Sequence, residues 1–313
     1  MSSEHADRTA DFRSGFAALA GRPNVGKSTL LNALVGETVA IATHRPQTTR
    51  NRIRGIVHRP GGQVVFVDTP GIHQHPRAIN EHMLAEARAA LGDVDLCVVL
   101  IEADGRGSRP EATEEDRLVL DAVRRCGKPA LLAVNKVDRL ADRGRLLPLL
   151  ETYAALGLFE ELIPISALRG EGLDALLAAI ERRLPEGPAY FPEDMITDQP
   201  ERELAAEFIR QQAILRVSQE LPYSLAVEVE SFHDLPGASP FVGIQAVLYV
   251  ERDSQKGILI GKRGQNLRQI GRAARQAIEG LLGVRVHLDL RVKVARGWSK
   301  SRGGLRRVGF REP

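Results

Sequence analysis

Short apolar segments recur along the first 184 residues, each followed by a polar loop and a stretch of helical length. Five of them are apolar at nearly every position: 16–20, 63–67, 96–101, 130–134 and 162–165. Strands that are apolar on both faces are buried between helical layers, as in a largely parallel sheet. We therefore expect an α/β domain with helices on both faces of the sheet. Ligands should bind at the carboxyl ends of its strands.

The pattern changes after residue 184. Residues 185–200 contain four prolines, which disfavour a regular element. The pattern then predicts a helix at 201–220, strands at 224–231 and 244–252, an amphipathic helix at 265–282 and an alternating strand at 284–294. We expect a flexible tail at 1–14, a first domain at 15–184, a linker at 185–202, a smaller α+β domain at 203–295 and a basic tail at 296–313.

Composition places the chain among soluble proteins. Its 313 residues are 43% hydrophobic and 27% charged, which suits about two globular domains. No apolar run approaches the ~20 residues of a membrane helix, and the N-terminus has no signal-peptide pattern. The two cysteines, Cys97 and Cys126, fit buried thiols in a reducing compartment. The sequence thus predicts a cytoplasmic protein.

Charge is unevenly distributed. Residues 252–311 hold 16 lysines and arginines against three acidic residues, whereas the rest of the chain holds 27 against 37. A basic module joined to an acidic one favours a polyanionic partner for the C-terminal third.

A glycine-rich loop follows the first predicted strand and opens a helix. It fits the pattern G-x-x-x-x-G-K-S, in which backbone N–H groups and a helix N-terminus surround phosphates. Lys27 would reach the β- and γ-phosphates and the Ser28 hydroxyl would bind Mg²⁺. The nucleotide-binding residues expected here are Gly21, Arg22, Pro23, Asn24, Val25, Gly26, Lys27, Ser28 and Thr29.

Two further segments are expected to sense the γ-phosphate. The second predicted strand ends in Asp68, Thr69, Pro70, Gly71 and Ile72. Asp68 would hold Mg²⁺ through water, and the Gly71 amide would contact the γ-phosphate. In the upstream loop 47–50, either Thr48 or Thr49 could bind the metal, and we favour Thr49. Both loops would be ordered by a triphosphate and released on hydrolysis.

The nucleotide base is predicted by the residues Asn135, Lys136, Val137 and Asp138 after the fourth strand. A carboxylate such as Asp138 accepts both guanine N1–H and the N2 amine, whereas adenine would leave it unpaired. Ser166 and Ala167, after the fifth strand, would complete the pocket. These motifs therefore predict binding of GTP and GDP.

Together these motifs resemble the GTPase domains of the translation-factor class. One departure affects the mechanism: Ile72 follows the glycine, so the water-orienting glutamine of Ras-like enzymes is missing. No arginine finger is evident in the chain apart from the candidates Arg45 and Arg50. The resemblance implies slow intrinsic hydrolysis in which Asn24 helps to hold K⁺ in place of the arginine, so that Lys27, Thr49, Gly71 and Asn24 are the expected catalytic residues. His73 and His75 fit polar loop residues better than zinc ligands, since no third ligand accompanies them.

The basic module contains a second glycine loop. Gly261, Lys262, Arg263 and Gly264 precede the helix 265–282, whose Arg268, Arg272 and Arg275 lie off its apolar stripe. A G-x-x-G loop before a helix allows a nucleic-acid backbone to approach closely. The order helix–strand–strand–loop–helix–strand resembles a type II KH domain. Trp298 in the tail could stack on a base or pack into the core.

The combination of both domains resembles the Era family of bacterial GTPases, over residues 15–310. The segments GRPNVGKSTLLNALVG, VDTPGIH, NKVD, ELPYSLAVEVE and ILIGKRGQNLRQIG carry the resemblance. It implies a GTP-gated protein that binds the 3′ end of small-subunit ribosomal RNA, assists rRNA processing and assembly of the 30S subunit, acts as a monomer and contacts the cytoplasmic face of the membrane peripherally. Two alternatives are a tRNA-modifying GTPase, which would need a further domain and a reactive cysteine, and a membrane or cell-cycle signalling GTPase whose KH domain binds protein.

Overall fold

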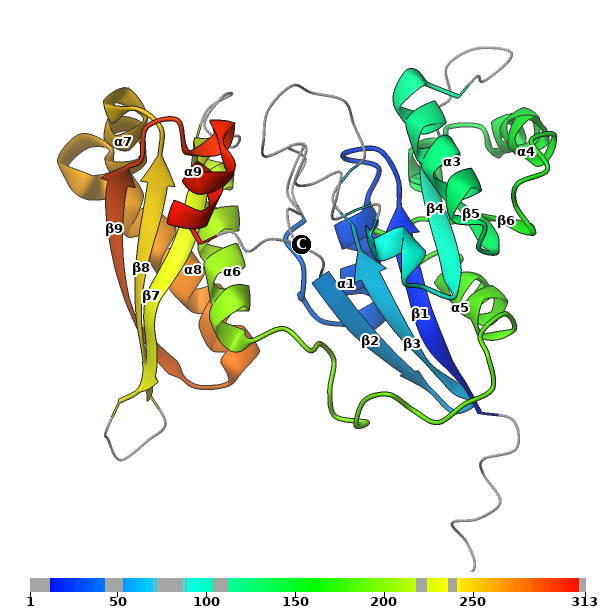
Figure 1. Ribbon diagram of the computed structural model, residues 1–313, viewed down its shortest axis with the longest axis horizontal. Helices are drawn as coiled ribbons and strands as arrows, with labels where there is room; N and C mark the ends of the chain where they lie inside the picture. The colour runs from blue at the N-terminus through cyan, green and yellow to red at the C-terminus, as the bar shows by residue number, and fades with distance from the viewer. Residues whose placement is uncertain are drawn as a thin grey trace, which may run out of the picture. The chain divides into compact units, whose positions relative to one another are not determined.

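The chain forms two compact units in the computed structural model (Figure 1). The structure describes residues 12–42, 53–69, 71, 87, 89–103, 112–217, 224–235 and 241–309. The first unit contains the elements from β1 to α5 and the segment that follows α5 as far as Asp198, and the second contains the elements from α6 to α9.

The first unit is built on a six-stranded sheet with the order β2-β3-β1-β4-β5-β6. All neighbouring pairs are parallel except β2 and β3, so the expected mostly parallel sheet is confirmed. The strands are β1 (Arg13–Ala20), β2 (Ile53–Arg59), β3 (Gly62–Asp68), β4 (Leu96–Glu102), β5 (Ala130–Asn135) and β6 (Glu161–Pro164). β1 begins two residues inside the tail expected at 1–14, because Arg13 and Ser14 pair with β3.

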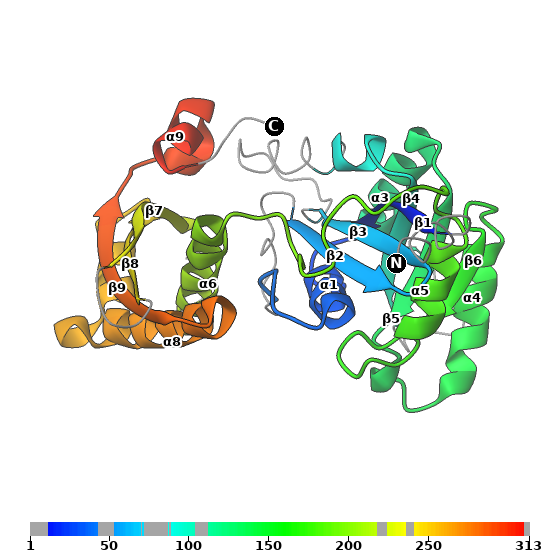
Figure 2. The same cartoon turned by 90° about the horizontal axis from the view of Figure 1, so that it is seen from below.

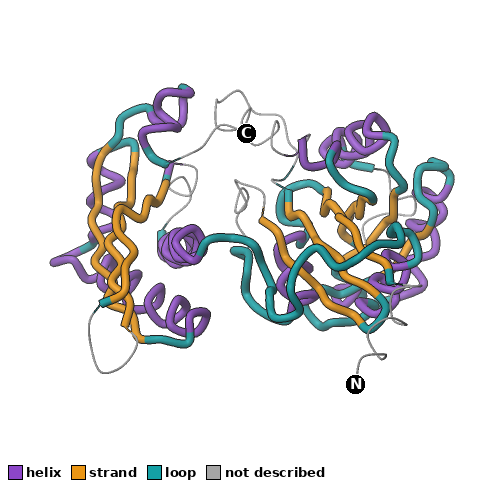
Figure 3. The backbone as a smooth tube through the Cα atoms, turned by 60° about the horizontal axis from the view of Figure 1, so that its bottom comes forward, coloured by secondary structure: helices purple, strands orange, loops and turns teal. Residues whose placement is uncertain are grey.

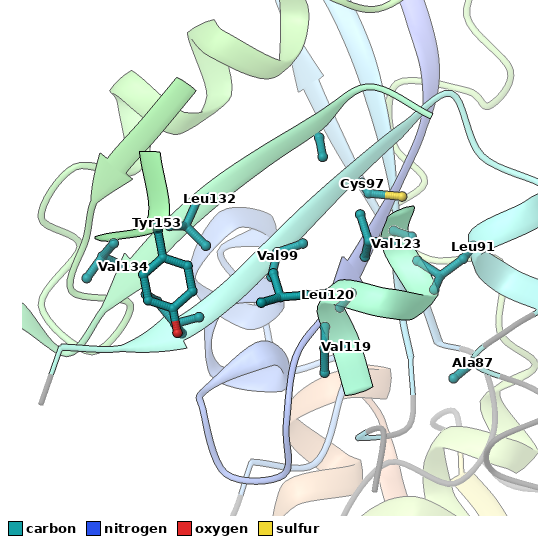
Figure 4. Close-up of a cluster of buried hydrophobic side chains, with 14 of the residues drawn as sticks. Ala87, Leu91, Cys97, Val99, Val119, Leu120, Val123, Leu132, Val134 and Tyr153 are labelled. Carbon is teal, nitrogen blue, oxygen red and sulfur yellow. The ribbon is translucent and has the colours of Figure 1, made fainter. Parts of the chain in front are cut away.

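Helices cover both faces of this sheet (Figure 3). They are α1 (Lys27–Val35), α3 (Glu114–Cys126), α4 (Leu146–Ala154) and α5 (Leu173–Glu181), with short 3-10 turns η1 (Val137–Arg139) and η2 (Arg143–Arg145). Figure 4 shows Val119, Leu120 and Val123 of α3 in one buried cluster with Val99 of β4, and Tyr153 of α4 beside Val134. A capping box on Thr113 begins α3 and Gly127 in a left-handed conformation ends it. The apolar strands predicted from the sequence form this core.

The hydrophobic pattern of the sequence did not predict strand β2. It mixes Arg54, His58 and Arg59 with apolar residues, because an edge strand is only partly covered. The chain beyond α5 covers it: the Ile56 N–H donates to the Ile196 carbonyl at 2.8 Å, and the Thr197 hydroxyl donates to the Arg54 carbonyl at 2.6 Å.

The predicted linker is held along the first unit rather than extending from it. Gln63, fully buried in β3, accepts from the Tyr190 and Phe191 N–H groups at 2.7 and 3.0 Å and donates to the Phe191 carbonyl at 2.7 Å. The ring of Tyr190 also packs on Phe16, with centroids 5.0 Å apart. Residues 185–198 therefore act as a strap, a name kept below, across β1, β3 and β2.

The second unit packs helices on one face of a three-stranded sheet (Figure 2). Its elements are α6 (Glu201–Arg216), β7 (Ala226–Asp234), β8 (Phe241–Val250), α7 (Asp253–Ile260), the turn η4 (Lys262–Gly264), α8 (Gln265–Leu282) and β9 (Arg285–Val294). β8 pairs antiparallel with β7 and parallel with β9. The sequence pattern predicted no element between the strand 244–252 and the G-x-x-G loop, but the structure has helix α7 there, which buries Leu259.

The C-terminal segment adds η5 (Trp298–Lys300) and α9 (Arg302–Arg307). Trp298 is fully buried, and its indole N–H donates to the Ser224 carbonyl at 3.2 Å. Of the two roles left open for Trp298, the structure places it in the core. The Ser299 hydroxyl also donates to the Glu251 carboxylate at 2.7 Å, so the start of the basic tail packs on the second unit.

The two cysteines are free thiols, as expected. Cys97 is buried at the start of β4, and Cys126 is half-buried at the end of α3, with the sulfurs 3.6 Å apart. Burial, followed by the neighbouring Cys126, raises the pKa of the Cys97 thiol, which keeps it unreactive.

Candidate nucleotide and nucleic-acid binding sites

The phosphate loop runs from Gly21 at the end of β1 to the first turn of α1. Gly26 has φ +108°, and a Cβ there would lie 2.3 Å from Nδ2 of Asn135. Asn24 is left-handed without being glycine, at φ 63°. α1 begins with no side-chain cap at Gly26, and the N-terminus of a helix favours an anion.

Lys27 lies inside this loop and is 6% exposed. Its ammonium donates to the carbonyls of Gly21 and Arg22 at 3.0 and 3.1 Å. Burial lowers the pKa of Lys27 from 10.5 to about 8, although the Asp68 carboxylate opposes the shift. A bound phosphate would compete for these ammonium hydrogens and stabilise the charged form.

Oxygen ligands for a divalent cation meet beside Lys27. The Ser28 hydroxyl donates to Oδ2 of Asp68 at 2.7 Å, and both side chains are buried. A hydroxyl and a carboxylate suit the hard ion Mg²⁺, so these two expected ligands fit the metal. Thr49, the third expected ligand, and the alternative Thr48 lie outside the described residues, as do Arg45, Arg50, Pro70, Ile72, His73 and His75.

The segment after β3 is tied to the phosphate loop. The buried Thr69 hydroxyl donates to the Leu19 carbonyl at 2.7 Å. A Cβ on Gly71 would lie 2.9 Å from the backbone nitrogen of Pro23. Only glycine permits this approach, which brings the expected γ-phosphate sensor against the phosphate loop.

Asn135 joins the predicted base pocket to the phosphate loop. Its Nδ2 donates to the Val25 carbonyl at 2.9 Å, and its Oδ1 accepts from the Ala167 N–H at 3.0 Å. Asp138 is half-buried and accepts from the Ser166 hydroxyl at 2.6 Å. The structure therefore brings the residues predicted from three separate loops to one edge of the sheet, around the position where a guanine and its phosphates would lie.

Sequence reasoning missed two acidic residues at this site. Glu102, at the end of β4, contacts Arg22 at 3.1 Å and Lys136 at 2.9 Å. Asp116, 7% exposed in the first turn of α3, lies 3.6 Å from Nε of Arg22. A glutamate that ends an otherwise apolar strand beside two nucleotide loops is the signal that could have identified Glu102.

The G-x-x-G loop connects α7 to α8. Gly261 has φ +70°, and a Cβ there would lie 2.7 Å from Cβ of Asn266. Asn266 fixes the loop by donating from Nδ2 to the Ile258 carbonyl at 3.0 Å. Lys262 and Arg263 are exposed, and Arg263 is held at φ 52°. The loop thus presents two cations from a tightly constrained backbone.

The three arginines of α8 are all exposed, as their position off the apolar stripe predicts. Arg268 donates to the Arg263 carbonyl, which joins the first of them to the loop. Arg275 lies 4.0 Å from Glu279. Arg268, Arg272 and Arg275 therefore continue the positive charge of the G-x-x-G loop along one helix.

Two negative findings concern the described part of the chain. No helix within it is long and apolar enough to cross a membrane. It also holds no group of three or more His, Cys, Asp or Glu side chains that could bind a metal ion.

These geometries define a P-loop GTPase domain followed by a KH domain. A family model described as "50S ribosome-binding GTPase" matches residues 16–136, and a KH-domain model matches residues 220–299. The chain belongs to the Era family of GTPases. It is 46% identical to the GTPase Era of Geobacter metallireducens, covering 96% of this chain and 98% of that one, and 44% identical to that of Mycobacterium bovis, covering 96% and 99%.

Solved Era structures have the same fold. A single-residue variant of Aquifex aeolicus Era bound to GDP·AlF₄⁻ matches with a TM-score of 0.88 and 38% identity, over 95% of this chain and 99% of that one. An Era complex with MgGDPNP and nucleotides 1506–1542 of 16S ribosomal RNA matches with the same values. The expected family, the fold class and the GTPase class are thereby confirmed.

Proposed function

We propose that this protein is a GTP-controlled RNA-binding factor that binds the 3′ region of 16S ribosomal RNA through its KH domain and assists assembly of the 30S subunit. The observation that carries the proposal is the exposed pair Lys262 and Arg263, held between two positive-φ glycines at the start of α8. Backbone N–H groups and two cations there suit a phosphate backbone. The Era complex with a 16S rRNA fragment supports the choice of RNA.

In the first unit, we assign GTP and GDP to the loops around Lys27, Asn135 and Asp138. Ser28 and Asp68 would hold Mg²⁺, together with Thr49. The metal would neutralise charge on the β- and γ-phosphates. Lys27 would balance further phosphate charge, and Asp138 would select guanine by accepting from its N1–H and N2 amine.

Ile72 stands where Ras-like enzymes have the glutamine that orients the attacking water. Other groups must therefore assist hydrolysis in this protein. We assign to Asn24 a role in holding K⁺ beside the phosphates. The carbonyl of Asn24 accepts a hydrogen bond from Lys136 Nζ at 2.8 Å. Hydrolysis should then be faster in K⁺ than in Na⁺ and lose this difference in Asn24→Ala. Equal rates of the unaltered protein in the two salts would refute the K⁺ role.

The RNA proposal is tested with a labelled oligonucleotide carrying the 3′ end of 16S rRNA. It is titrated with GDP or a non-hydrolysable GTP analogue at two salt concentrations. The Gly261→Asp, Gly264→Asp double variant should lose binding, since a Cβ at Gly261 clashes and two carboxylates repel phosphate. Gly280→Asp is the control, because Gly280 has open space around its Cβ position on the same helix.

Three results are informative. Tight, salt-dependent binding that needs the triphosphate and disappears in the double variant supports the proposal. Equal RNA binding in the presence of GDP and of the GTP analogue would refute control of RNA binding by GTP. Absence of RNA binding would favour the alternative of a signalling GTPase at the membrane, tested by sedimentation with anionic vesicles.

A further inference from the structure

Glu102 lies at the end of a strand whose two neighbours both lead into nucleotide-binding loops. β4 lies between β1, which leads into the phosphate loop, and β5, which leads into the base-recognition residues. Glu102 is the last residue of β4 and pairs in register with Asn135. The Ala103 N–H then donates to the Asn135 carbonyl at 2.7 Å. The side chain of Glu102 therefore emerges between the two nucleotide loops.

One carboxylate there contacts three cations. Oε2 lies 3.1 Å from Arg22 Nη2 and 2.9 Å from Lys136 Nζ, and Oε1 lies 3.1 Å from Arg139 Nη1. The side chains of Glu102, Arg22 and Lys136 are about one-fifth exposed, at 21%, 23% and 19%, whereas that of Arg139 is 65% exposed. The first two ion pairs are thus largely shielded from solvent, where a charge-assisted contact is stronger than at the surface.

The same cations hold strained backbone. Lys136 is left-handed at φ 67°, and its ammonium also donates to the carbonyl of Asn24, which is left-handed at φ 63°. Such conformations cost of order 1–3 kcal/mol each and persist only where the surroundings hold them. Arg22, two residues before Asn24, forms ion pairs with both Glu102 and Asp116.

We propose that Glu102 is a positioning residue that joins the phosphate loop to the base pocket and thereby sets how long the protein retains a guanine nucleotide. The inference rests on the nucleotide site assigned above. Glu102 acts through Arg22 and Lys136 and contacts no reacting atom. Its removal should open both loops together, so GDP and GTP should be affected alike.

Electrostatics agree with this role. Burial alone would raise the pKa of Glu102, but the hydrogen bond and charge of Lys136, with the charges of Arg22 and Arg139, outweigh burial and lower it. The carboxylate is therefore ionised at neutral pH. Glu102→Gln keeps its shape but removes the charge that holds the cations.

The test measures dissociation of fluorescent N-methylanthraniloyl GDP and the corresponding GDPNP from the full chain. Glu102→Gln should release both nucleotides about tenfold faster, by the same factor. In steady-state GTP hydrolysis it should raise KM with kcat unchanged. Arg22→Gln, which leaves Glu102 paired with Lys136, should release both nucleotides about threefold faster, and it serves as the second variant if Glu102→Gln does not fold.

Glu161→Gln is the matched control, because Glu161 also bridges two arginines, Arg182 and Arg183 at 3.0 and 3.2 Å, away from the nucleotide loops. It should leave dissociation unchanged. Unchanged dissociation in Glu102→Gln, or a lower kcat with unchanged KM, would overturn the inference. If the unaltered protein does not bind the fluorescent nucleotides, the assigned site itself fails, which is a distinguishable outcome.

Discussion

Replacing Gln63 with leucine should loosen the strap formed by residues 185–198. The two side chains have similar volume, so packing inside β3 changes little. Leucine, however, leaves the Tyr190 N–H, the Phe191 N–H and the Phe191 carbonyl without their partner in the protein. These three hydrogen bonds span 127 or 128 residues of sequence, so their loss should free the strap from β3.

The magnitude follows from those three hydrogen bonds. Each contributes a net ~1 kcal/mol, and water can partly replace Gln63 because Tyr190 is 54% exposed. The free energy of unfolding of the first unit should fall by about 2–3 kcal/mol. For a unit of this size, each kcal/mol lowers the melting temperature by about 2–4 °C, so we expect a loss of about 8 °C.

The assay uses the single tryptophan. Trp298 is buried in the second unit, so its fluorescence follows unfolding of that unit, whereas far-UV circular dichroism follows both units. Gln63→Leu should lower the dichroism transition and leave the fluorescence transition in place. Limited proteolysis should also cut the strap faster.

Gln276→Leu, on an exposed position of α8, makes the same chemical change without buried partners and should shift neither transition. A Gln63→Leu protein that melts within about 1 °C of the unaltered protein, well below the shift expected for this size of unit, with its strap still protected, would refute the reasoning. It would mean that the strap is held by its other contacts alone.

Three further variants test the nucleotide site, the core of the second unit and the G-x-x-G loop. Gly26→Ala places a Cβ 2.3 Å from Asn135 Nδ2 and should weaken GDP at least 100-fold in a fluorescence titration; affinity within threefold of normal would contradict this. Trp298→Ala empties a fully buried site and should destabilise the second unit by about 3–5 kcal/mol in urea unfolding followed by circular dichroism, an expectation that an unchanged midpoint would exclude. Lys262→Ala with Arg263→Ala removes two exposed cations and should lower the slope of log affinity for single-stranded RNA against log salt by about 1.4; an unaltered slope would show that neither cation contacts phosphate.

Much of the candidate site was predictable because its motifs are contiguous. The loop 21–28, the residues 135–138 and the loop 261–264 each occupy a short window whose glycines, lysines and carboxylates suit one local conformation. The helix 265–282 was predicted with the bounds of α8, since its apolar residues repeat at three and four positions and glycines flank both ends.

Other elements have no readable local pattern. β2 is an edge strand whose Arg54 and His58 contact the strap, while Arg59 pairs with α5. α7 is only eight residues long and contains Gly257, a poor helix former, so its sequence gives little local signal for a helix. In both cases tertiary packing decides a conformation that local propensity leaves undecided.

Neighbouring residues alone were enough to predict the buried strands of the first unit, the phosphate, base and G-x-x-G loops, and the family. Three other features exist only in the folded chain: Trp298 belongs to a core, Gln63 holds a strap, and Glu102 meets Arg22 across 80 residues of chain. Such contacts join residues that are distant in sequence. Their partners are selected by the three-dimensional arrangement of the strands, which no periodicity along the chain records.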